Sequence, residues 1–466
     1  MENIEYMRKI PGLFISIVIT LNCFGQREDS ILLRKIYTEA LTHGQCYANL
    51  DYLSNKIGGR PSGSLQAQKA VEWTYLAMKM AGSDSVFEQE CMVPHWVRGN
   101  KEKGQIRTSS RQEDTEDVNI CALGGSIGTP AEGILASVIE VKSVEELYLL
   151  GTKKIKGKIV FFNRPFDISE IDPFKAYGKA VDQRWKGPSV AAKFGAVATI
   201  CRSMTTDIND FPHTGSMTYS DSIPEKVPAC AISTVSAERL SELLKRSTSG
   251  VQFYLKMDCK TLPDEKSYNV IAEIKGSEFP EKIIVVGGHL DSWDTGDGAQ
   301  DDGAGVVQAM EVIRIFKTLG IKPKRTIRAV AFMNEENGAR GGSKYAEIAK
   351  KNNEQHALAI ETDRGGFSPR GFSLTGSSEK RELLMKWKPL FEPYGIYDFS
   401  RQGGGTDIEP LGKMGVPMME LFPDPQRYFD HHHCPNDTFK YVSKRELEMG
   451  AASLAALIYL ASEHNF

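Results

Sequence analysis

The chain has 466 residues, more than one hydrophobic core usually organises, so we expect two domains or one large domain that carries an insert. Hydrophobic residues make up 41% of the chain and charged residues 25%, as in soluble globular proteins. A formal net charge of −3 provides no basic surface of the kind that binds nucleic acid, so we exclude a nucleic-acid-binding function.

The N-terminus has the layout of a secretory signal peptide. Arg8 and Lys9 precede the apolar stretch Leu13–Leu21, and small and polar residues follow it. The apolar stretch is shorter than the roughly 20 residues that span a bilayer, and no later segment is expected to span one. We therefore predict a signal peptide at residues 1–25 and a secreted or periplasmic protein. A buried N-terminal strand and lipid attachment through Cys23 are the alternatives.

Residues 26–126 open with helical patterning. The segment "SLQAQKAVEWTYLAMKMAG" predicts a helix that Ser64 caps and Gly82 ends. Residues 127–263 are richer in short β runs, such as "KIVFFN", "AVATICR" and "VQFYLKM", which Gly, Pro and Ser divide. We predict that this middle part is a separate small module, with the polar stretches Arg107–Asn119 and Thr261–Asn269 as its boundaries.

Residues 264–466 alternate strand and helix. Apolar runs such as "KIIVVGGH", "TIRAVAFMN", "ALAIETD" and "GVPMMEL" are separated by helical segments such as "GVVQAMEVIRIFKTLG". Strands that are apolar throughout and linked by helices indicate an α/β sandwich with a largely parallel central sheet. In such sheets, binding and catalytic sites collect beyond the carboxyl ends of the strands.

The eight cysteines are scattered and form no metal-binding or disulfide framework. If the signal peptide is removed after Cys23, seven remain, and an odd number argues against full pairing. A disulfide between Cys201 and Cys230 is one possibility, because both lie in short strand-like runs of the middle part.

Histidines and carboxylates follow several of the predicted strands. His289, Asp291, Asp301 and Asp302 follow the first, Glu335 and Glu336 the second, and Asp363 the third, and "DHHHCPND" follows the last. A single cluster of this kind is commonly a solubilising loop or a helix cap. Their joint occurrence at one edge of a sheet is much harder to produce by chance. Carboxylates brought together without a cation would repel strongly, so the arrangement requires metal.

Imidazole and carboxylate ligands without thiolate favour zinc, with cobalt or manganese as chemically allowed substitutes. Three ligating carboxylates and one bridging hydroxide balance the charge of two divalent ions. Two such ions would polarise a carbonyl and activate water, which is the chemistry of a hydrolase. The adjacent Glu335 and Glu336 supply one carboxylate for metal and one for general base catalysis, and spacing alone leaves open which is which.

The motifs "GGHLDSWDTGDGAQDDGAG", "NEENG", "ETDRGG", "GGGTDI" and "HHHCPNDT" resemble, in this order, those of the M28 family of co-catalytic zinc peptidases. The resemblance implies a three-layer α/β sandwich with a mixed, largely parallel central sheet. It implies that the middle part is a protease-associated domain that shapes the approach to the site. It also implies two Zn²⁺ per chain and a homodimer.

Carried over residue by residue, the resemblance implies a role for seven side chains. His289 would bind one zinc, Asp301 would bridge both, and Glu336 and Asp363 would each serve one metal. His433 would bind the second zinc, and it is preferred over its neighbours because it stands four residues before Asp437, as the family motif requires. Asp291 would orient the His289 ring, and Glu335 would be the general base.

We therefore expect a secreted exopeptidase that hydrolyses dipeptides or short peptides. An aminopeptidase is the alternative within the same chemistry, and which end of the peptide is gripped stays open. A glutaminyl-cyclase-like transferase with a single zinc and an inactive binding ectodomain are the alternatives from other classes. Arg364 and Arg401 are candidates for residues that face the substrate, or else solvated loop residues.

Overall fold

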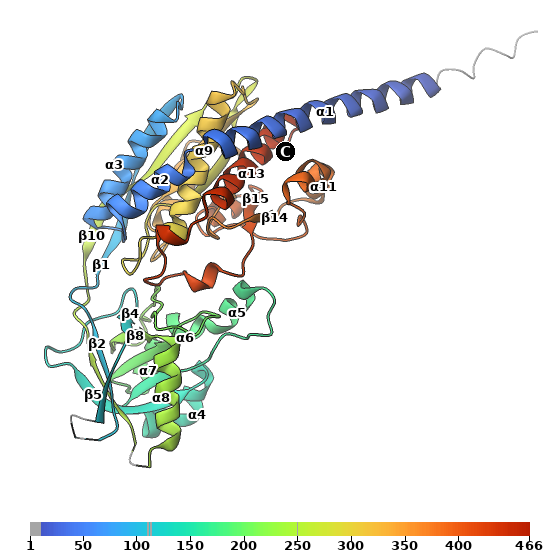
Figure 1. The fold of residues 1–466 in the computed structure, drawn as a ribbon. Coiled ribbons are helices and arrows are strands. Elements are labelled where there is room, and N and C mark those ends of the chain that lie inside the picture. The colour runs from blue at the N-terminus through green and yellow to red at the C-terminus, as the bar shows by residue number, and fades with distance from the viewer. Residues whose placement is uncertain (1–10, 110, 112–113, 249) are drawn as a thin grey trace, which may run out of the picture.

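The computed structural model describes residues 11–109, 111, 114–248 and 250–466, and these form two regions, each built on its own sheet (Figure 1). The large region comprises residues 11–97 and 260–466, and the insert comprises residues 98–259 between them. The sheet of the large region consists of β1 (Ser85–Val97), β10 (Lys260–Ile274), β11 (Phe279–His289), β12 (Arg325–Phe332), β13 (Gln355–Glu361), β14 (Pro369–Thr375) and β15 (Met418–Pro423).

This sheet is seven-stranded, in the order β1-β10-β12-β11-β13-β15-β14. The neighbours β12, β11, β13 and β15 are parallel, whereas β1, β10 and β14 pair with their neighbours in antiparallel fashion. The sheet is therefore mixed, parallel at its centre and antiparallel at both edges. β12 is buried at every residue, because helices cover both of its faces.

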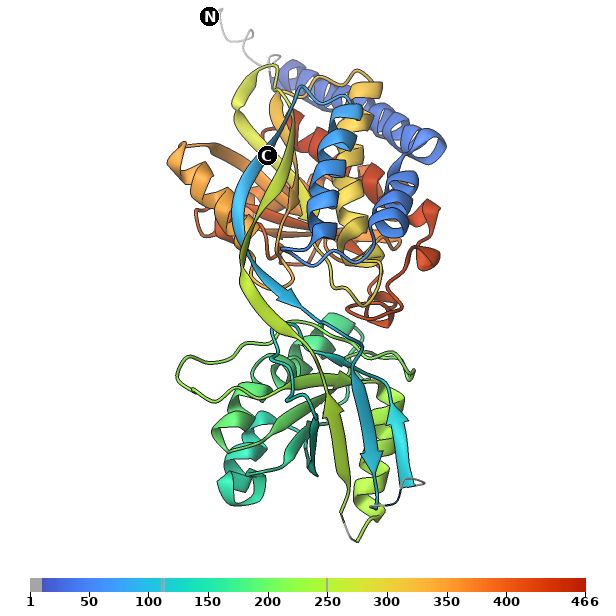
Figure 2. The same ribbon diagram turned by 90° about the vertical axis from the view of Figure 1, so that its left-hand side faces the viewer.

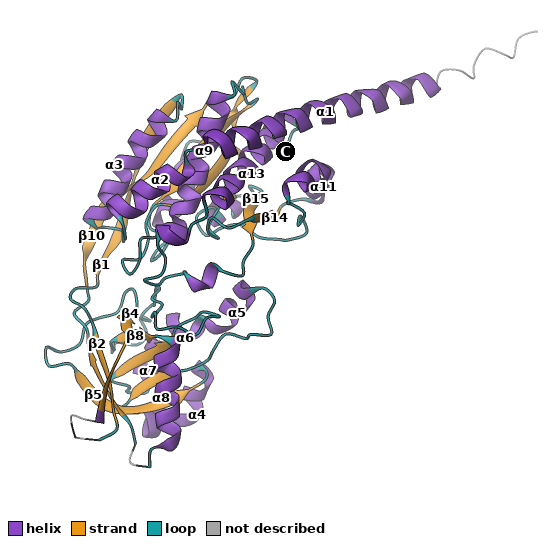
Figure 3. Cartoon of the chain, viewed as in Figure 1, coloured by secondary structure: helices purple, strands orange, loops and turns teal. Residues whose placement is uncertain are grey.

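Helices cover the two faces unequally and make a three-layer structure (Figure 3). Alternate residues of β11 show the two faces: Ile284 and Val286 belong to one apolar core, and Ile283 and Val285 to the other. The first core includes α1 (Pro11–His43), α3 (Leu65–Met80), α9 (Ala304–Thr318), α11 (Ser378–Phe391) and α13 (Lys444–Glu463). The second includes α10 (Arg340–Lys351) and α12 (Glu409–Gly412).

The expected cap of α3 is present, since the Ser64 side chain accepts a hydrogen bond from the backbone N–H of Ala67, and Gly82 follows the helix with a φ of 89°. The remaining short helices of the large region are α2 (Cys46–Tyr52), η1 (Leu53–Ile57), η3 (Ala299–Gly303), η4 (Glu392–Tyr394), η5 (Tyr428–Asp430) and η6 (Phe439–Tyr441).

The insert has an eight-stranded sheet in the order β3-β2-β9-β5-β6-β7-β8-β4. Its strands are β2 (Lys103–Arg107), β3 (Thr115–Val118), β4 (Ile120–Ala122), β5 (Ile134–Val141), β6 (Ile159–Phe162), β7 (Ala198–Arg202), β8 (Ala229–Ile232) and β9 (Gln252–Lys256). Its helices are α4 (Val144–Ile155), α5 (Pro173–Ala180), α6 (Asp182–Trp185), α7 (Gly187–Lys193) and α8 (Thr234–Arg246).

The first three strands of the insert correct the boundary that we expected at residue 126. β2, β3 and β4 belong to the insert's sheet, although the sequence placed them in the preceding part. The polar stretch Arg107–Asn119 is not a linker: it contains β3, which pairs antiparallel with β2 at the edge of the sheet. An edge strand of an antiparallel pair carries polar side chains on its solvent face, so its composition resembled a loop.

One antiparallel ribbon joins the two regions (Figure 2). β1 and β10 pair from Ser85 opposite Glu273 to Val97 opposite Lys260, with a bulge between Val93 and His95. The chain therefore leaves the large region and returns to it on neighbouring strands. A second contact is made by the insert's α5, whose aromatic side chains pack against Tyr428 and Phe429 of the large region.

The expected signal segment, residues 1–25, starts in residues 1–10, which lie outside the described residues, and continues into the first turns of α1. The side chain of Cys23, the expected lipid-attachment residue, also lies outside the described part. Among the helices that the structure describes, none combines the length and apolar character that a bilayer crossing requires.

The disulfide considered between Cys201 and Cys230 is not formed, and both thiols are free and buried. In the parallel pair β7 and β8, Cys201 lies opposite Ala231, whereas Cys230 lies opposite Ile200. Because side chains alternate across a sheet, the two sulfur atoms point to opposite faces and join different apolar clusters. The two strands are neighbours, but their register excludes the Cys201–Cys230 disulfide.

Candidate metal centre

The histidine and carboxylates expected after separate strands meet at the carboxyl ends of the central parallel strands. His289 is the last residue of β11, and Asp301 lies in η3, between β11 and α9. Glu336 follows β12, and Asp363 follows β13. His433 comes from the loop after η5, beyond β15. The topology therefore gathers residues that are up to 144 positions apart in the sequence, and the sheet fixes where each enters the site.

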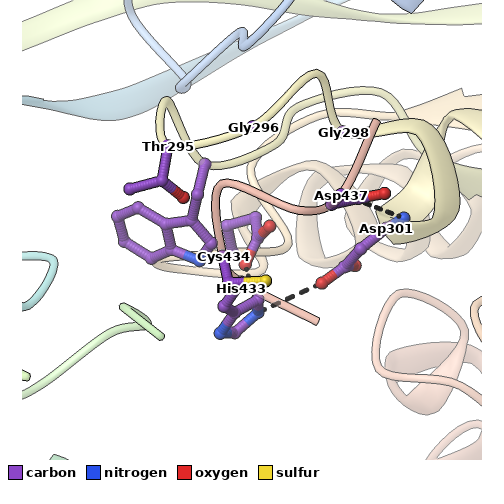
Figure 4. A pocket seen from close by; sticks show the side chains of 9 residues that line it. Thr295, Gly296, Gly298, Asp301, His433, Cys434 and Asp437 are labelled. Carbon is purple, nitrogen blue, oxygen red and sulfur yellow. Dashed lines mark hydrogen bonds and ion pairs between the residues drawn. The ribbon is translucent and has the colours of Figure 1, made fainter. Parts of the chain in front are cut away.

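Asp301 lies at the centre of this cluster and divides its two oxygens between two histidines. Its Oδ1 is 3.1 Å from Nε2 of His289. Its Oδ2 is 3.2 Å from Nε2 of His433, and Figure 4 shows this second contact. Each histidine also faces one further carboxylate. Nε2 of His289 is 3.5 Å from Oδ1 of Asp363, and Nε2 of His433 is 3.0 Å from Oε2 of Glu336. The five side chains thus form two groups that share Asp301.

Several acceptor atoms in the cluster have no hydrogen-bond donor. Oδ2 of Asp301, Oε1 of Glu336 and Oδ1 of Asp363 are buried without a hydrogen-bond partner. Burying ionised oxygens in this way is unfavourable unless a cation or a proton compensates them. Imidazole nitrogens that converge on such oxygens are a donor set suited to zinc, so the residues fit a metal at each end of Asp301.

The acid–base properties of the carboxylates reflect the same crowding. Burial raises the pKa of Glu336 to about 8, and the negative charge of Asp301 adds to that effect. Burial likewise raises the pKa of Asp363 to about 7, against the opposing effect of His289. Burial also acts on Asp301, but the hydrogen bond with His289 and the charge of the neighbouring His433 hold its pKa well below the usual range. The shared carboxylate is therefore the one that is most readily ionised.

His432 and Asp302 lie close to the cluster but are engaged otherwise. The His432 ring stacks on His433 with centroids 3.5 Å apart, and its Nε2 is 3.9 Å from Oδ2 of Asp301. Asp302 accepts hydrogen bonds at 3.0 Å from the backbone N–H groups of His289 and Gly305. His433 thus approaches the shared carboxylate more closely than its neighbour does, and Asp302 fastens the start of α9 to the end of β11.

We expected the Asp291 carboxylate to orient the His289 ring, but it holds the backbone of the Glu335–Glu336 loop instead. Nδ1 of His289 is 2.9 Å from the backbone carbonyl oxygen of Asp291, whereas the Asp291 carboxylate is 3.9 Å from that nitrogen. The carboxylate instead accepts hydrogen bonds from the backbone N–H groups of Asn334, Glu335 and Glu336, at 2.6, 3.1 and 3.4 Å. Asp291 therefore orients the histidine through its main chain and positions the Glu335–Glu336 loop through its side chain.

Two further residues shape the site from outside the predicted set. Asp437 accepts hydrogen bonds from the backbone N–H groups of Gln300 and Asp301, at 2.7 and 3.2 Å. The guanidinium of Arg60, which is fully buried, donates to the backbone carbonyls of Leu290, Asp297 and Gly298. The spacing of Asp437 from His433 was a usable signal. No sequence pattern pointed to Arg60, because its partners are main-chain carbonyls, which every residue type carries.

Known proteins resemble this chain over most of its length. A model of peptidase family M28 matches residues 269–458. Carboxypeptidase Q from Bos taurus is 36% identical over 440 residues, which cover 94% of this chain and 89% of the bovine protein. Carboxypeptidase Q from Homo sapiens is 35% identical over 439 residues, with coverage of 94% and 89%. The chain belongs to peptidase family M28.

Solved structures agree with this membership. The M28 peptidase precursor from Shewanella amazonensis superposes on this chain with a TM-score of 0.89 and 32% identity, covering 94% of this chain and 98% of that one. A zinc aminopeptidase from Bacillus subtilis has a TM-score of 0.64 and 20% identity, covering 90% and 95%. The second likeness concerns the fold alone. The chain is thus an M28 metallopeptidase whose sequence resembles carboxypeptidase Q.

In this M28 chain a cavity of about 240 Å³ opens onto the candidate metal ligands Asp301, Glu336, Asp363 and His433. Glu335 lines it too and is half-buried, unlike the buried Glu336 beside it. The remaining lining residues come from both regions: Phe174, Tyr177, Arg184, Ser216, Tyr428, Phe429 and His432. The cavity therefore lies between the large region and the insert.

We considered Arg364 and Arg401 of this M28 chain as substrate-facing residues. They line a separate hollow, and each is paired with a carboxylate. Nε of Arg364 is 2.7 Å from Oε1 of Glu420. Arg401 is 2.7 Å from the Asp398 carboxylate and 2.9 Å from Asp172 of the insert. Both arginines have carboxylate partners of their own, so neither provides an unpaired charge to the metal cavity.

Proposed function

We propose that the chain is a secreted co-catalytic zinc exopeptidase of the carboxypeptidase type that hydrolyses dipeptides or short peptides. The observation that carries the proposal is Asp301, whose two oxygens face two separate histidines at 3.1 and 3.2 Å. A carboxylate in this position would serve two metal ions, and such a pair would supply the chemistry of peptide hydrolysis. The likeness to carboxypeptidase Q supports the choice of substrate class.

His289 and Asp363 would hold one zinc, Glu336 and His433 the other, and Asp301 both. Zinc bound there would supply Lewis acidity, which polarises the scissile carbonyl and makes water a stronger nucleophile. Asp291 would keep the loop of Glu335 and Glu336 in place through the three backbone hydrogen bonds that its carboxylate accepts.

Glu335 would act as the general base. It lines the cavity and is less buried than Glu336, so its carboxylate is available to the substrate and to water. Oε2 of Glu336 is 3.0 Å from Nε2 of His433, so the Glu336 carboxylate already contacts that histidine. Glu335 would therefore take the proton from the attacking water and pass it to the amine that leaves.

The other parts of the chain take roles that follow from the same assignment. Residues 1–25 would be a removed signal peptide, and the protein would be secreted or periplasmic. The β-rich insert would be a protease-associated domain, and the large region on either side of it would be the peptidase domain. The active form would be a homodimer.

The decisive experiment combines metal analysis with hydrolysis by the Glu335→Gln variant. We expect about two zinc ions per chain in both forms, and a fall in turnover of about 100- to 10,000-fold in the variant. Glu409→Gln, at an exposed site, is the matched control and should keep full activity. Retained turnover in Glu335→Gln would refute the base assignment, and one zinc per chain with all ligands intact would favour the cyclase-like alternative.

The same preparation separates the two exopeptidase types. A carboxypeptidase should hydrolyse N-acetylated peptides and reject C-amidated ones. An aminopeptidase should show the reverse preference, and a strict dipeptidase should reject both blocked forms. Preference for C-amidated peptides would therefore replace the carboxypeptidase proposal with the aminopeptidase alternative.

A further inference from the structure

Arg184 brings a buried positive charge from the insert to the metal cavity. It lies on α6, its side chain is only 5% exposed, and it lines the cavity together with Glu335 and Asp363. Among the described residues that line this cavity, it is the only arginine or lysine. Catalysis by the metal ligands and Glu335 does not use it, so its presence calls for a separate explanation.

Within the part of the chain that the structure describes, the guanidinium of Arg184 has no negatively charged partner. Nη1 is 3.3 Å from the Thr214 carbonyl oxygen and 3.4 Å from Nδ1 of His433, and Nη2 donates to the Tyr177 hydroxyl at 2.7 Å. Nε is buried and has no hydrogen-bond partner. A buried guanidinium with a free donor and no anion is unfavourable by itself, which indicates that an anion completes the site.

Other buried arginines of the chain are compensated. Every nitrogen of the Arg60 guanidinium donates to backbone carbonyl oxygens. Arg202, in the insert, pairs with Glu238 at 2.6 Å. Arg184 differs from both, because it combines an unpartnered Nε with a place in the wall of a cavity.

The surroundings of Arg184 are built to keep the guanidinium where it is. Gly215 has a φ of 127°, and a Cβ atom there would lie 2.3 Å from Nη1 of Arg184. The Tyr177 hydroxyl oxygen accepts from Arg184, so its own hydrogen remains to be donated to a second group. Tyr177 also packs on Phe429 and on His432, with centroids 5.1 and 5.2 Å away. A fixed arginine and a hydroxyl donor side by side suit a carboxylate.

We infer that Arg184, assisted by Tyr177, binds the C-terminal carboxylate of the peptide substrate. The inference rests on the proposed function and deepens it, because it names the residues that determine which end of the peptide is gripped. Carboxylates and a guanidinium line the same cavity, a combination of charges that complements a short zwitterionic peptide. The volume of about 240 Å³ is below the roughly 300–1,000 Å³ of ordinary ligand pockets, which also favours a short substrate.

The test compares a neutral dipeptide with its C-terminal amide in the zinc-loaded full chain. In the native protein, kcat/KM should be much higher for the free acid than for the amide. Arg184→Gln should lower kcat/KM for the acid by about 10- to 100-fold and leave the amide nearly unchanged, so the preference collapses. Lys186→Gln, which removes an exposed charge two residues away, is the matched control and should keep the preference.

Two outcomes of this kinetic comparison overturn the inference. One is a native protein that hydrolyses the amide as well as the acid. The other is an equal loss on both substrates in Arg184→Gln, because a purely structural role would affect them alike. If Arg184→Gln does not fold, Tyr177→Phe replaces it and should reduce the acid preference by about ten-fold through the loss of one charged hydrogen bond. An unchanged preference in Tyr177→Phe overturns the inference as well.

A binding measurement separates failure of this inference from failure of the proposed function. Calorimetric titration with a non-hydrolysable dipeptide analogue and with its C-terminal amide requires no turnover. Tighter binding of the acid that disappears in Arg184→Gln supports the carboxylate site, even if the native protein hydrolyses no peptide and the proposed function fails. Equal binding of acid and amide by the native protein overturns the carboxylate site, whatever the activity.

Discussion

The large region and the insert meet at the same cavity, and both bring aromatic side chains to it, but the charged groups that they contribute differ in sign. The large region contributes carboxylates and imidazoles from the ends of hydrogen-bonded parallel strands. The insert contributes Arg184 and the aromatic side chains of α5 from two short helices. Groups that hold metal must converge closely, and rigid strand ends provide that. Groups that recognise a substrate need only reach the cavity.

The comparison suggests that chemistry and substrate recognition are encoded in separate parts of the chain. Changes at the strand ends of the large region should then affect metal content and turnover, and changes in the insert or in its contact with the large region should affect substrate binding alone. Of the four predictions below, the first three test this division and the fourth tests the stability of the large region by itself; they run from the largest expected effect to the smallest.

Asp301→Asn removes the carboxylate that both metal groups share. We expect the zinc content to fall below one ion per chain and turnover to fall by more than about 1,000-fold, because several kcal/mol of metal assistance are lost. Elemental analysis and a dipeptide assay measure both quantities. Asp221→Asn removes one exposed carboxylate from the insert and should change neither. Full zinc content in Asp301→Asn would refute the shared role of Asp301.

Asp291→Ala removes the acceptor of three backbone hydrogen bonds in the Glu335–Glu336 loop. We expect zinc affinity or kcat to fall by about 10- to 100-fold, the usual range for a residue that orients a metal ligand. The backbone carbonyl that binds His289 stays in place, so the loss should be smaller than in Asp301→Asn. A zinc titration and steady-state kinetics separate the two effects. A loss as large as that of Asp301→Asn would contradict this assignment.

Phe429→Ala weakens the contact between the regions, because this ring packs on Phe166, Phe174 and Tyr177 of the insert. We expect KM to rise by about ten-fold, equivalent to about 1.4 kcal/mol of binding, with zinc content and kcat retained. Phe211→Ala, a partly exposed site in the insert, is the control and should leave KM unchanged. Loss of zinc in Phe429→Ala would show that the two regions are not separable.

Glu448→Gln tests stability in the helical layer, away from the insert. Burial, with the nearby Glu311, raises the pKa of Glu448 from its ordinary value of 4.5 to about 7. The folded state therefore binds this proton more tightly than the unfolded state, and ionisation destabilises the fold as pH rises through that interval. The variant should be more stable than the native protein by about 1 to 2 kcal/mol at pH 8 and nearly equal at pH 4.5. Thermal unfolding at both pH values measures the difference, and a gain independent of pH would contradict this explanation.

The sequence was most informative where a side chain directly follows an apolar strand. His289, Asp301, Glu336 and Asp363 could be located because the central strands are continuous apolar runs, and parallel strands end at one edge. The mixed α/β character was predicted for the same reason. The polar edge strand β3 was missed, because it has the composition of a loop.

The contribution of the insert could not be predicted from the sequence. Arg184 lies in a short helix without amphipathic periodicity, and it is 249 residues from His433, its neighbour in space. Arg60 binds main-chain carbonyls, which leave no trace in residue types. Asp291 was expected to orient the His289 ring, but residue types do not tell whether its carboxylate or its backbone carbonyl faces that histidine. These contacts depend on tertiary packing, which spacing does not encode.

The ribbon of β1 and β10 has a consequence for how such a chain can be altered. The chain leaves the large region at Val97 and re-enters it at Lys260, and these residues are paired neighbours. From the viewpoint of the seven-stranded sheet, the insert occupies the place of a hairpin turn. A module of any length can be grafted between two such ends at little extra loop-closure entropy. If the insert determines substrate preference as proposed, the architecture would allow that preference to be exchanged with the insert, while the strand ends that carry the candidate metal ligands stay unchanged.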